Sequence, residues 1–530
     1  MTAQIFTVNP QGLKTKGIAF SYPDGKICYR DQEIHDYLAQ ADSFSDFSLR
    51  CAHLNGQWRA VVRPKYDPSL ICIAVDAIGS YRVFYKEENG KILLSDNGFD
   101  LMPERFPIQP DSELYFSRWG FLPNRKTLHS QVFRLSSGSC MRIDPSGIIS
   151  QKRYLDYLQP TEEPLPENKD ELIDYATAAF DQAFDLMLRA IDGRPVLLPL
   201  TGGRDSRLIA CALKKRNYAN VQTFSYGKDA LIDDCLRAQR VAKDLGFPHR
   251  FIPSIPSHYG KDGYLYDEEA IDYLKYISGG ASGFFFQEYL PAKVLSREYA
   301  GKNSVVLPGH IADLLLGSNF IEPRTELLTD LRQLAIRLLR LHGGNRILSS
   351  SDRETLIEQI KEQLVVYANA AKSLTPIQIY QLFLFQNLEI KYYVNSSNSW
   401  RFFGMDVWLP YADRGLHRFA FSLPDKHLFC KQLYEAVAKR YFAECGVSYL
   451  DDYSLLSVQT GRVGHLKNFF RPYVYRILER RSRIGREDSI GLAPIMKQMY
   501  SQIRKEGKYH PTTVNGLSFA WLLRSLRGGI

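Results

Sequence analysis

The sequence lacks paired cysteines. Its 8 cysteines are scattered over 530 residues, and no two have the C-x-x-C spacing that is typical of zinc sites and redox pairs. The same scatter along so long a chain does not fit the dense disulfide framework of small secreted domains. We therefore expect reduced thiols and a cytoplasmic protein.

Long apolar runs are also missing. No stretch approaches the roughly 20 apolar residues that cross a bilayer, and residues 1–12 have neither the basic region nor the apolar core of a signal peptide. The net charge of +9, from 67 basic and 58 acidic residues, is only a weak indication of an acidic partner. We interpret the basic run at residues 461–486 as a solvated helix face, and expect no membrane span and no nucleic-acid partner.

Core-forming residues are abundant, since 45% of the chain is hydrophobic and 13% aromatic, enough for two or more domains. Residues 1–157 predict a layered, β-rich domain, and residues 158–170, rich in proline and acid, predict a linker. Residues 171–530 begin with alternating strands and helices and then become mainly helical. The strands expected in the first part are residues 58–63, 69–75, 81–85, 91–94, 131–135, 139–143 and 148–151.

The most informative stretch is RPVLLPLTGGRDSRLIACAL, residues 194–213. Its apolar run predicts a buried central strand, and residues 207–213 predict a helix. The turn between them contains two adjacent glycines, which let an anion approach the unpaired amides at the start of a helix. We predict that phosphates bind here, through Leu200, Thr201, Gly202, Gly203, Asp205 and Ser206.

The lysine of the Walker loop is absent from this turn, so the site is not a kinase-type phosphate loop. Asp205 is expected to hold the magnesium ion that accompanies a nucleotide, because Mg²⁺ prefers carboxylate oxygens. The alternative interpretation is an ordinary strand-to-helix turn with capping residues.

The segment LTGGRDS, residues 200–206, resembles the pyrophosphate loop SGGxDS of ATP pyrophosphatases, in the form that asparagine synthetases carry. Thr201 replaces the first serine and keeps a hydroxyl. The resemblance implies that the loop grips the β- and γ-phosphates of ATP while a carboxylate attacks the α-phosphorus. It also implies a doubly wound parallel sheet, with ligands at the carboxyl ends of its strands.

The next predicted strand, VQTFSY at residues 221–226, resembles the family strand whose edge backbone reads adenine. The resemblance places Phe224 and Tyr226 at the nucleotide. His249 follows at a position where the family has a histidine, although a structural histidine is an equal alternative.

The segment PGHIADLLLGSNF, residues 308–320, resembles the family pattern SGEGADExxGGY and keeps Gly309 and Asp313. The resemblance places Gly309 at the nucleotide and Asp313 at a second magnesium carboxylate. We therefore predict that Asp205 and Asp313 lie on adjacent strand ends and together hold metal and pyrophosphate.

His310 stands where the family has a glutamate that helps to manage the proton of the attacking amine. An imidazole whose pKa lies near neutrality would do the same work. We predict a catalytic role for His310, together with Asp313. The alternatives are that His310 only contacts phosphate, or that the histidine reflects a loss of catalysis.

The helical remainder has helical spacing over residues 330–341, 353–371 and 376–394. It continues into YYVNSSNSWRFFGMDVWLPYAD, which is similar to synthetase-related proteins of bacterial surface-polysaccharide clusters. A family lysine that stabilises the transition state has no counterpart. The nearest cation, Arg462, is predicted to replace it electrostatically, without reproducing the lysine contact in detail.

Residues 50–100 resemble the later half of the glutaminase domain of asparagine synthetases, an Ntn-hydrolase-like layered fold. Such a glutaminase uses an N-terminal cysteine as its nucleophile, whereas Met1 is followed by Thr2 and the glutamine-binding segment is missing. We expect a degenerate glutaminase-like domain over residues 1–157, a linker over 158–170 and an asparagine-synthetase-like ATP-pyrophosphatase domain over 171–530.

The resemblance implies a carbon-nitrogen ligase that uses ATP and Mg²⁺, adenylates a carboxylate and transfers it to ammonia or an amine. The acid is a sugar acid of a surface polysaccharide, an aspartate-like acid or a peptide carboxylate, and a homodimer is one expected assembly. Intramolecular amide closure, as in lasso-peptide cyclases and β-lactam synthetases, and a non-catalytic nucleotide-binding descendant are the alternatives. A tRNA thiolase fits the basic charge but requires paired catalytic cysteines.

Overall fold

The computed structural model describes most of the chain, with defined gaps. The described residues are 5–7, 13–147, 149–155, 164–253, 267–283, 286–317, 330–343, 348–370, 374–428, 431–447, 491–506, 511 and 513–526. Within these ranges no helix combines the length and the apolar character that a bilayer crossing requires.

The second half of the molecule is built on a five-stranded parallel sheet, with the strand order β13-β12-β11-β14-β15. β11 (Val196–Pro199) is the central strand, and Val196, Leu197 and Leu198 are at most 1% exposed. A strand that is apolar at consecutive positions fits a sheet covered on both faces. The other strands are β12 (Val221–Gly227), β13 (His249–Pro253), β14 (Val305–Val306) and β15 (Asp406–Val407).

The connections make this sheet doubly wound. From β11 the chain passes through α5 (Arg204–Lys215) to β12 and through α6 (Asp233–Leu245) to β13. It then returns past β11, through α7 (Glu268–Ser278) and α8 (Phe286–Tyr299), to β14 on the other side. The strand order therefore reverses between β11 and β14, and such a switch point opens a crevice at the carboxyl ends of the two strands.

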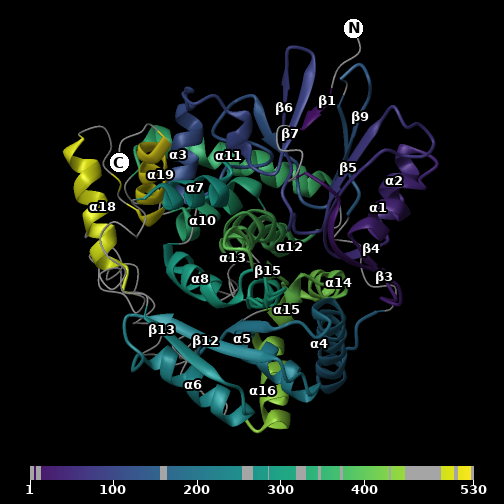
Figure 1. The fold of residues 1–530 in the computed structure, drawn as a ribbon, viewed down its shortest axis with the longest axis vertical. Coiled ribbons are helices and arrows are strands. Elements are labelled where there is room, and N and C mark those ends of the chain that lie inside the picture. The colour runs from purple at the N-terminus through teal and green to yellow at the C-terminus, as the bar shows by residue number, and fades with distance from the viewer. Residues whose placement is uncertain are drawn as a thin grey trace.

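The first half is a β-rich assembly of two further sheets (Figure 1). One sheet has the order β1-β7-β6-β8 and the other β10-β9-β5-β4-β2-β3. Their strands are β1 (Ile5–Thr7), β2 (Lys16–Ser21), β3 (Cys28–Arg30), β4 (Leu54–Val62), β5 (Ile71–Val75), β6 (Phe84–Glu88), β7 (Lys91–Ser95), β8 (Val132–Arg134), β9 (Ser139–Ile143) and β10 (Ile149–Arg153). The helices are α1 (Asp31–Ala39), α2 (Phe44–Ala52) and α3 (Pro110–Trp119), with a 3₁₀ turn at Gly98–Leu101.

The remaining helices lie between the β-rich half and the parallel sheet, or beside it (Figure 1). They are α4 (Lys169–Ile191), α9 (Ala312–Leu315), α10 (Leu331–His342), α11 (Ser350–Ala370), α12 (Pro376–Phe383), α13 (Asn398–Phe402), α14 (Arg414–Ser422), α15 (Asp425–Leu428), α16 (Gln432–Cys445), α18 (Ala493–Lys505) and α19 (Val514–Leu526), with a 3₁₀ turn at Pro410–Ala412. The helix expected over residues 376–394 changes to π-helical geometry over Leu384–Val394. A long π-helical stretch is unusual, and π geometry often marks a functional site.

Segments far apart in the sequence share one core. α3 belongs to the β-rich half by sequence, yet Phe116 packs against Phe519 of α19 with ring centroids 4.9 Å apart. The Tyr115 hydroxyl on the same helix accepts a hydrogen bond from Gln363 of α11 at 3.1 Å. The two halves are therefore joined by buried packing as well as by the chain.

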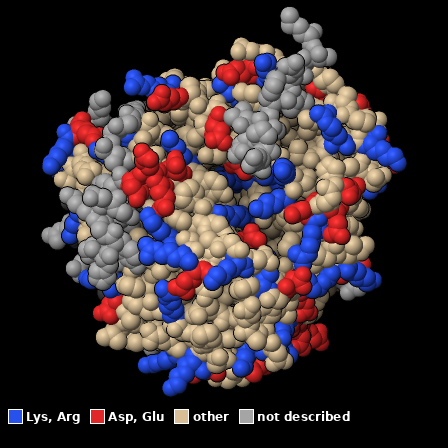
Figure 2. All heavy atoms as spheres, in the orientation of Figure 1, with Lys and Arg blue, Asp and Glu red and all other residues tan. Residues whose placement is uncertain are grey.

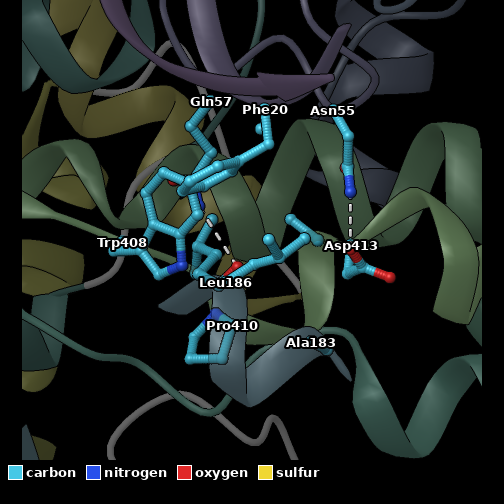
Figure 3. A pocket seen from close by; sticks show the side chains of 11 residues that line it. Phe20, Asn55, Gln57, Ala183, Leu186, Trp408, Pro410 and Asp413 are labelled. Atoms are coloured by element: carbon cyan, nitrogen blue, oxygen red, sulfur yellow. Dashed lines mark hydrogen bonds between the residues drawn. The ribbon is translucent and has the colours of Figure 1, made fainter. Parts of the chain in front are cut away.

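Polar contacts also join the halves, around β4 (Figure 3). Asn55 points at Asp413, and its Nδ2 donates to Asp413 Oδ2 at 2.6 Å. Gln57 Nε2 donates to the Leu409 carbonyl at 3.1 Å. The cavity beside them measures about 10 Å³, which is room for about one water molecule. The halves are thus closely packed at this point.

Replacing Asn55 with alanine is expected to lower the free energy of unfolding by about 1–3 kcal/mol, because it leaves the buried carboxylate of Asp413 without this donor. Asp413 is 7% exposed, and burial raises the pKa of its carboxyl group, against the Asn55 hydrogen bond. Without the donor this pKa rises further, so the variant should lose more stability at pH 7 than near pH 4. Urea unfolding at both pH values measures this, and the exposed Asn220→Ala is the matched control. Equal losses of stability at both pH values would show that Asn55 does not stabilise the ionised carboxylate of Asp413.

The other expected strands and helices that fall on described residues are confirmed within three residues, except that the strand predicted at 58–63 begins at Leu54 and the segment near residue 81 differs. The basic run at 461–486 lies outside the described residues. The strand predicted at 81–85 begins only at Phe84. Arg82 instead donates to the carbonyls of Ile277 and Tyr276 at 2.9 and 2.7 Å, which fixes that segment on α7. On the face shown in Figure 2, basic and acidic side chains are interspersed.

Candidate active site at the switch point

The turn after β11 has the shape predicted for an anion loop. α5 begins at Arg204 with Gly203 at its N-cap. Gly203 N–H donates to Thr201 Oγ1 at 3.0 Å, and Thr201 N–H donates to Ser206 Oγ at 3.1 Å. The two hydroxyls are 3.2 Å apart. The first turn of a helix of 12 residues therefore opens on a partly exposed loop of small and hydroxylated residues.

The turn after β14 lies directly against this loop. A Cβ atom at Gly309 would come within 3.0 Å of Asp205 Cβ and of the Ser206 backbone nitrogen. Only glycine permits so close an approach, which explains its presence. The two turns that the sequence placed at one site are thus in contact, at the point where the strand order reverses.

Two tyrosines hold Asp205 in place. The Tyr411 hydroxyl donates to the Asp205 carbonyl at 2.7 Å, and the Tyr434 hydroxyl donates to the Asp205 carboxylate. Both tyrosines are fully buried. Next to them Arg204 forms an ion pair with Glu435 at 2.6 Å. α16 and the 3₁₀ turn therefore fix the carboxylate at the rim of the loop, an arrangement that the sequence did not reveal.

α6 covers the other side of the loop. A Cβ atom at Gly202 would lie 2.7 Å from Asp234 Oδ1 and 3.0 Å from Arg237 Cδ. A side chain at this position would displace the Asp234 carboxylate and the Arg237 side chain of α6, which lie close against the loop. Asp234 and Arg237 bring one carboxylate and one guanidinium to the loop.

His310 is half-buried and lies beside a buried residue, Glu288 of α8. Its Nε2 lies 4.0 Å from Glu288 Oε1, and its ring centroid is 6.3 Å from that of Tyr393. Burial lowers the pKa of His310 to about 4 and raises the pKa of Glu288 to about 8. The expectation that His310 has a pKa near neutrality is therefore wrong, because burial disfavours the imidazolium.

The residue after His310 has an unusual backbone. Ile311 has φ of 90° and ψ of −49°, a conformation that costs a β-branched residue energy. The family pattern SGEGADE has glycine at this position. Ile311 is only 2% exposed, so its burial compensates for the strain. Backbone strain is often found at functional sites, and here it lies directly beside a candidate catalytic residue.

The residues predicted to contact the base are less accessible than expected. Phe224 is fully buried, and its carbonyl already accepts from Leu200 N–H at 2.8 Å. β12 has strand neighbours on both sides, so it offers no free edge there. A nucleotide contact through Leu200, Phe224 or Tyr226 stays a prediction.

His249 has a structural environment. Its Nδ1 and Nε2 lie 2.9 Å from Thr223 Oγ1 and 3.0 Å from Ser225 Oγ, so the ring joins β13 to β12. Burial lowers the pKa of His249 to about 4. The structure therefore favours a structural role for His249 over a role in the active site.

Two predicted residues lie outside what the structure describes. Arg462 falls in residues 448–490, and the side chain of Asp313 is outside the described part although its backbone belongs to α9. The pairing of Asp205 with Asp313 and the substitution by Arg462 therefore stay predictions. In the part of the chain that is described, no three His, Cys, Asp or Glu side chains cluster as a ready-made metal site.

The sequence profile of the asparagine synthase family matches residues 177–452, just over half of the chain. The chain belongs to the asparagine synthase family. Among curated proteins it is similar to asparagine synthetase [glutamine-hydrolyzing] 1 of Bacillus subtilis (strain 168), with 26% identity over 176 residues, 33% of this chain and 27% of the relative. The alignment thus spans about a quarter of the relative's length.

Among solved structures, the chain is similar to the NH₃-dependent NAD synthetase of Campylobacter jejuni subsp. jejuni NCTC 11168. That similarity covers 36% of this chain and 94% of the other, with 16% sequence identity and a TM-score of 0.22.

Three residues at the site were missed by sequence reasoning: Glu288, Tyr411 and Tyr434. Tyr411 lies in the segment YYVNSSNSWRFFGMDVWLPYAD, whose resemblance assigned it no role. Tyr434 and Glu288 stand in ordinary helical sequence. Only tertiary packing brings α16 and α8 to the switch point, so no local signal identified these two.

Proposed function

We propose that this protein is an ATP-dependent amide ligase that forms an acyl-adenylate and releases pyrophosphate. The observation that carries the proposal is the contact between the loop after β11 and the turn after β14, at the switch point of a parallel sheet. Membership of the asparagine synthase family supports it.

In this reaction the substrate carboxylate attacks the α-phosphorus of ATP, and pyrophosphate leaves. The amide groups around Gly202 and Gly203 and the hydroxyls of Thr201 and Ser206 would bind the departing group. An amine then displaces AMP from the adenylate and forms the amide. Preorganised donors of this kind stabilise the charge that develops on the leaving group.

Asp205 fits a magnesium ion chemically. It presents carboxylate oxygens at the rim of an anion loop, and Tyr411 and Tyr434 fix both its backbone and its side chain. We propose that Asp205 and Asp313 hold the Mg²⁺ that accompanies ATP. The ion would supply charge neutralisation for the phosphates.

For the acceptor we propose a small acid, with a sugar acid of a surface polysaccharide first. The support is the similarity of residues 392–413 to synthetase-related proteins of polysaccharide clusters. Intramolecular amide closure and a non-catalytic nucleotide-binding descendant stay the alternative functions. We further propose that the β-rich half is a degenerate glutaminase-like domain, on the support of its two layered sheets.

Carboxylate-dependent ATP–pyrophosphate exchange tests the proposal. The full-length protein is incubated with Mg-ATP, radiolabelled pyrophosphate and one acid at a time: glucuronate, galacturonate or aspartate. We expect label to enter ATP only when an accepted acid is present, because exchange requires a reversible adenylation step. Binding of ATP without exchange on any acid would contradict the ligase and favour the binding protein.

A further inference from the structure

Glu288 is buried and His310 half-buried, and the two side chains lie beside each other with one polar atom of each unpaired. Glu288 is 5% exposed. Glu288 Oε2 and His310 Nε2 are both enclosed and have no hydrogen-bond partner among the described residues. A buried polar atom without a partner costs free energy, and in a native protein it needs a reason. A separation of 4.0 Å is short enough for a proton or an ion pair to couple the two groups.

The surroundings of the pair are polar but uncharged. The groups around it are Tyr226 from β12, Tyr273 from α7, the ring of Tyr393 from the π-helical segment, and the hydroxyls of Ser396 and Ser399, which form hydrogen bonds with Glu288. Burial raises the pKa values of Tyr226 and Tyr273 above the usual range, so these rings stay neutral. No described cation neutralises Glu288, and His310 is the one titratable nitrogen within ion-pair distance in the described part of the chain.

We propose that Glu288 and His310 act as one proton acceptor for the amine that attacks the adenylate. His310 is the catalytic residue, and Glu288 is a positioning residue that compensates the imidazolium charge. This inference rests on the proposed function. Glu288 of α8 thus supplies a carboxylate at the place where the family pattern has a glutamate and this chain has His310.

The amine nitrogen forms a bond to the carbonyl carbon of the acyl-adenylate, and one proton passes from nitrogen to His310 Nε2. The bond from that carbon to the AMP oxygen breaks, and AMP leaves with the electron pair. Ionised Glu288 then faces a protonated imidazole, which is the favourable charge state of a buried pair.

The pH profile of amide formation distinguishes this role from a structural one. Ionised Glu288 favours the protonated form of His310, so the wild-type rate should rise as Glu288 ionises and level off above about pH 8. Glu288→Gln removes the charge but keeps the shape, and should abolish this rise and lower the plateau about 10²-fold. Hydroxylamine serves as the amine, because unlike ammonia it is already unprotonated at neutral pH.

Exchange separates the two steps of the reaction. Glu288→Gln and His310→Asn should leave ATP–pyrophosphate exchange within about threefold of wild type, since adenylation needs no amine, while amide formation falls by about 10² to 10⁴. Glu288→Asp should restore part of the pH dependence. Glu298→Gln, an exposed change on the same helix, should alter neither step. Equal losses in both steps, or an unchanged pH profile in Glu288→Gln, would overturn the proposal.

A measurement without turnover tests the pair by itself. In protein with labelled histidine, the ring resonance of His310 is the one of 11 that disappears in His310→Asn. We expect it to shift with an inflection near pH 8 in the wild type and to lose that inflection in Glu288→Gln. If the inflection persists in Glu288→Gln, the coupling is refuted whatever the substrate. If the inflection is lost in Glu288→Gln but no acid supports ATP–pyrophosphate exchange, the coupling of Glu288 with His310 is supported and the proposed ligase function is contradicted.

Discussion

Replacing Asp205 with asparagine should lower ATP–pyrophosphate exchange by about 10³-fold while the fold stays intact. Asparagine has the same shape and keeps an oxygen that can accept from Tyr434, the contact that holds this side chain. It lacks the negative charge that a hard cation requires. The loss should therefore come from the metal and the phosphates, and the melting temperature should change by no more than about 2 °C.

Calorimetric titration with ATP gives the matching binding test. In the wild type, Mg²⁺ should strengthen ATP binding, and in Asp205→Asn that difference should disappear. Tyr434→Phe removes one hydrogen bond to the carboxylate and should lower exchange only about five- to tenfold. Asp185→Asn, a change at an exposed side chain of α4, is the charge-matched control. Full exchange in Asp205→Asn would mean that residues 201–206 are an ordinary capping turn.

The parts of the site that sequence reasoning found are those built from local patterns. A short apolar run, two glycines and a capping residue predict β11, its turn and α5 without reference to the rest of the chain. The switch point follows from alternating strands and helices. Gly309 was matched by pattern, and its contact with Asp205 and Ser206 gives the physical reason.

The parts that sequence reasoning missed depend on long-range packing. Glu288 belongs to α8, whose sequence, FQEYLPAKVLSREY, contains a proline and has no clear apolar stripe. Nothing local shows that its carboxylate lies beside His310. The same holds for the pKa of His310, since burial is a property of the fold and not of the residue. β15 is only two residues long, too short for a periodic pattern to appear.

Replacing Gly317 with alanine should be among the most destabilising single changes in the chain. Gly317 has φ of +104°, and a Cβ atom there would lie 1.8 Å from the carbonyl oxygen of Leu428. That oxygen belongs to the backbone of α15, so the collision cannot be relieved by rotating a side chain. We expect a loss of about 4 kcal/mol or more in the free energy of unfolding, and a melting temperature about 10 °C lower.

The control for Gly317→Ala is Gly301→Ala, which separates the collision from backbone strain. Gly301 also has a positive φ, +73°, but a Cβ atom there would meet nothing within 4 Å. This control should cost only about 1 kcal/mol, the penalty for a side chain in the left-handed region. The difference between the two variants therefore measures how tightly the segment that carries His310 is held against α15. If both variants melt at the same temperature, Gly317 is not packed against Leu428, and the turn after β14 is not fixed from that side.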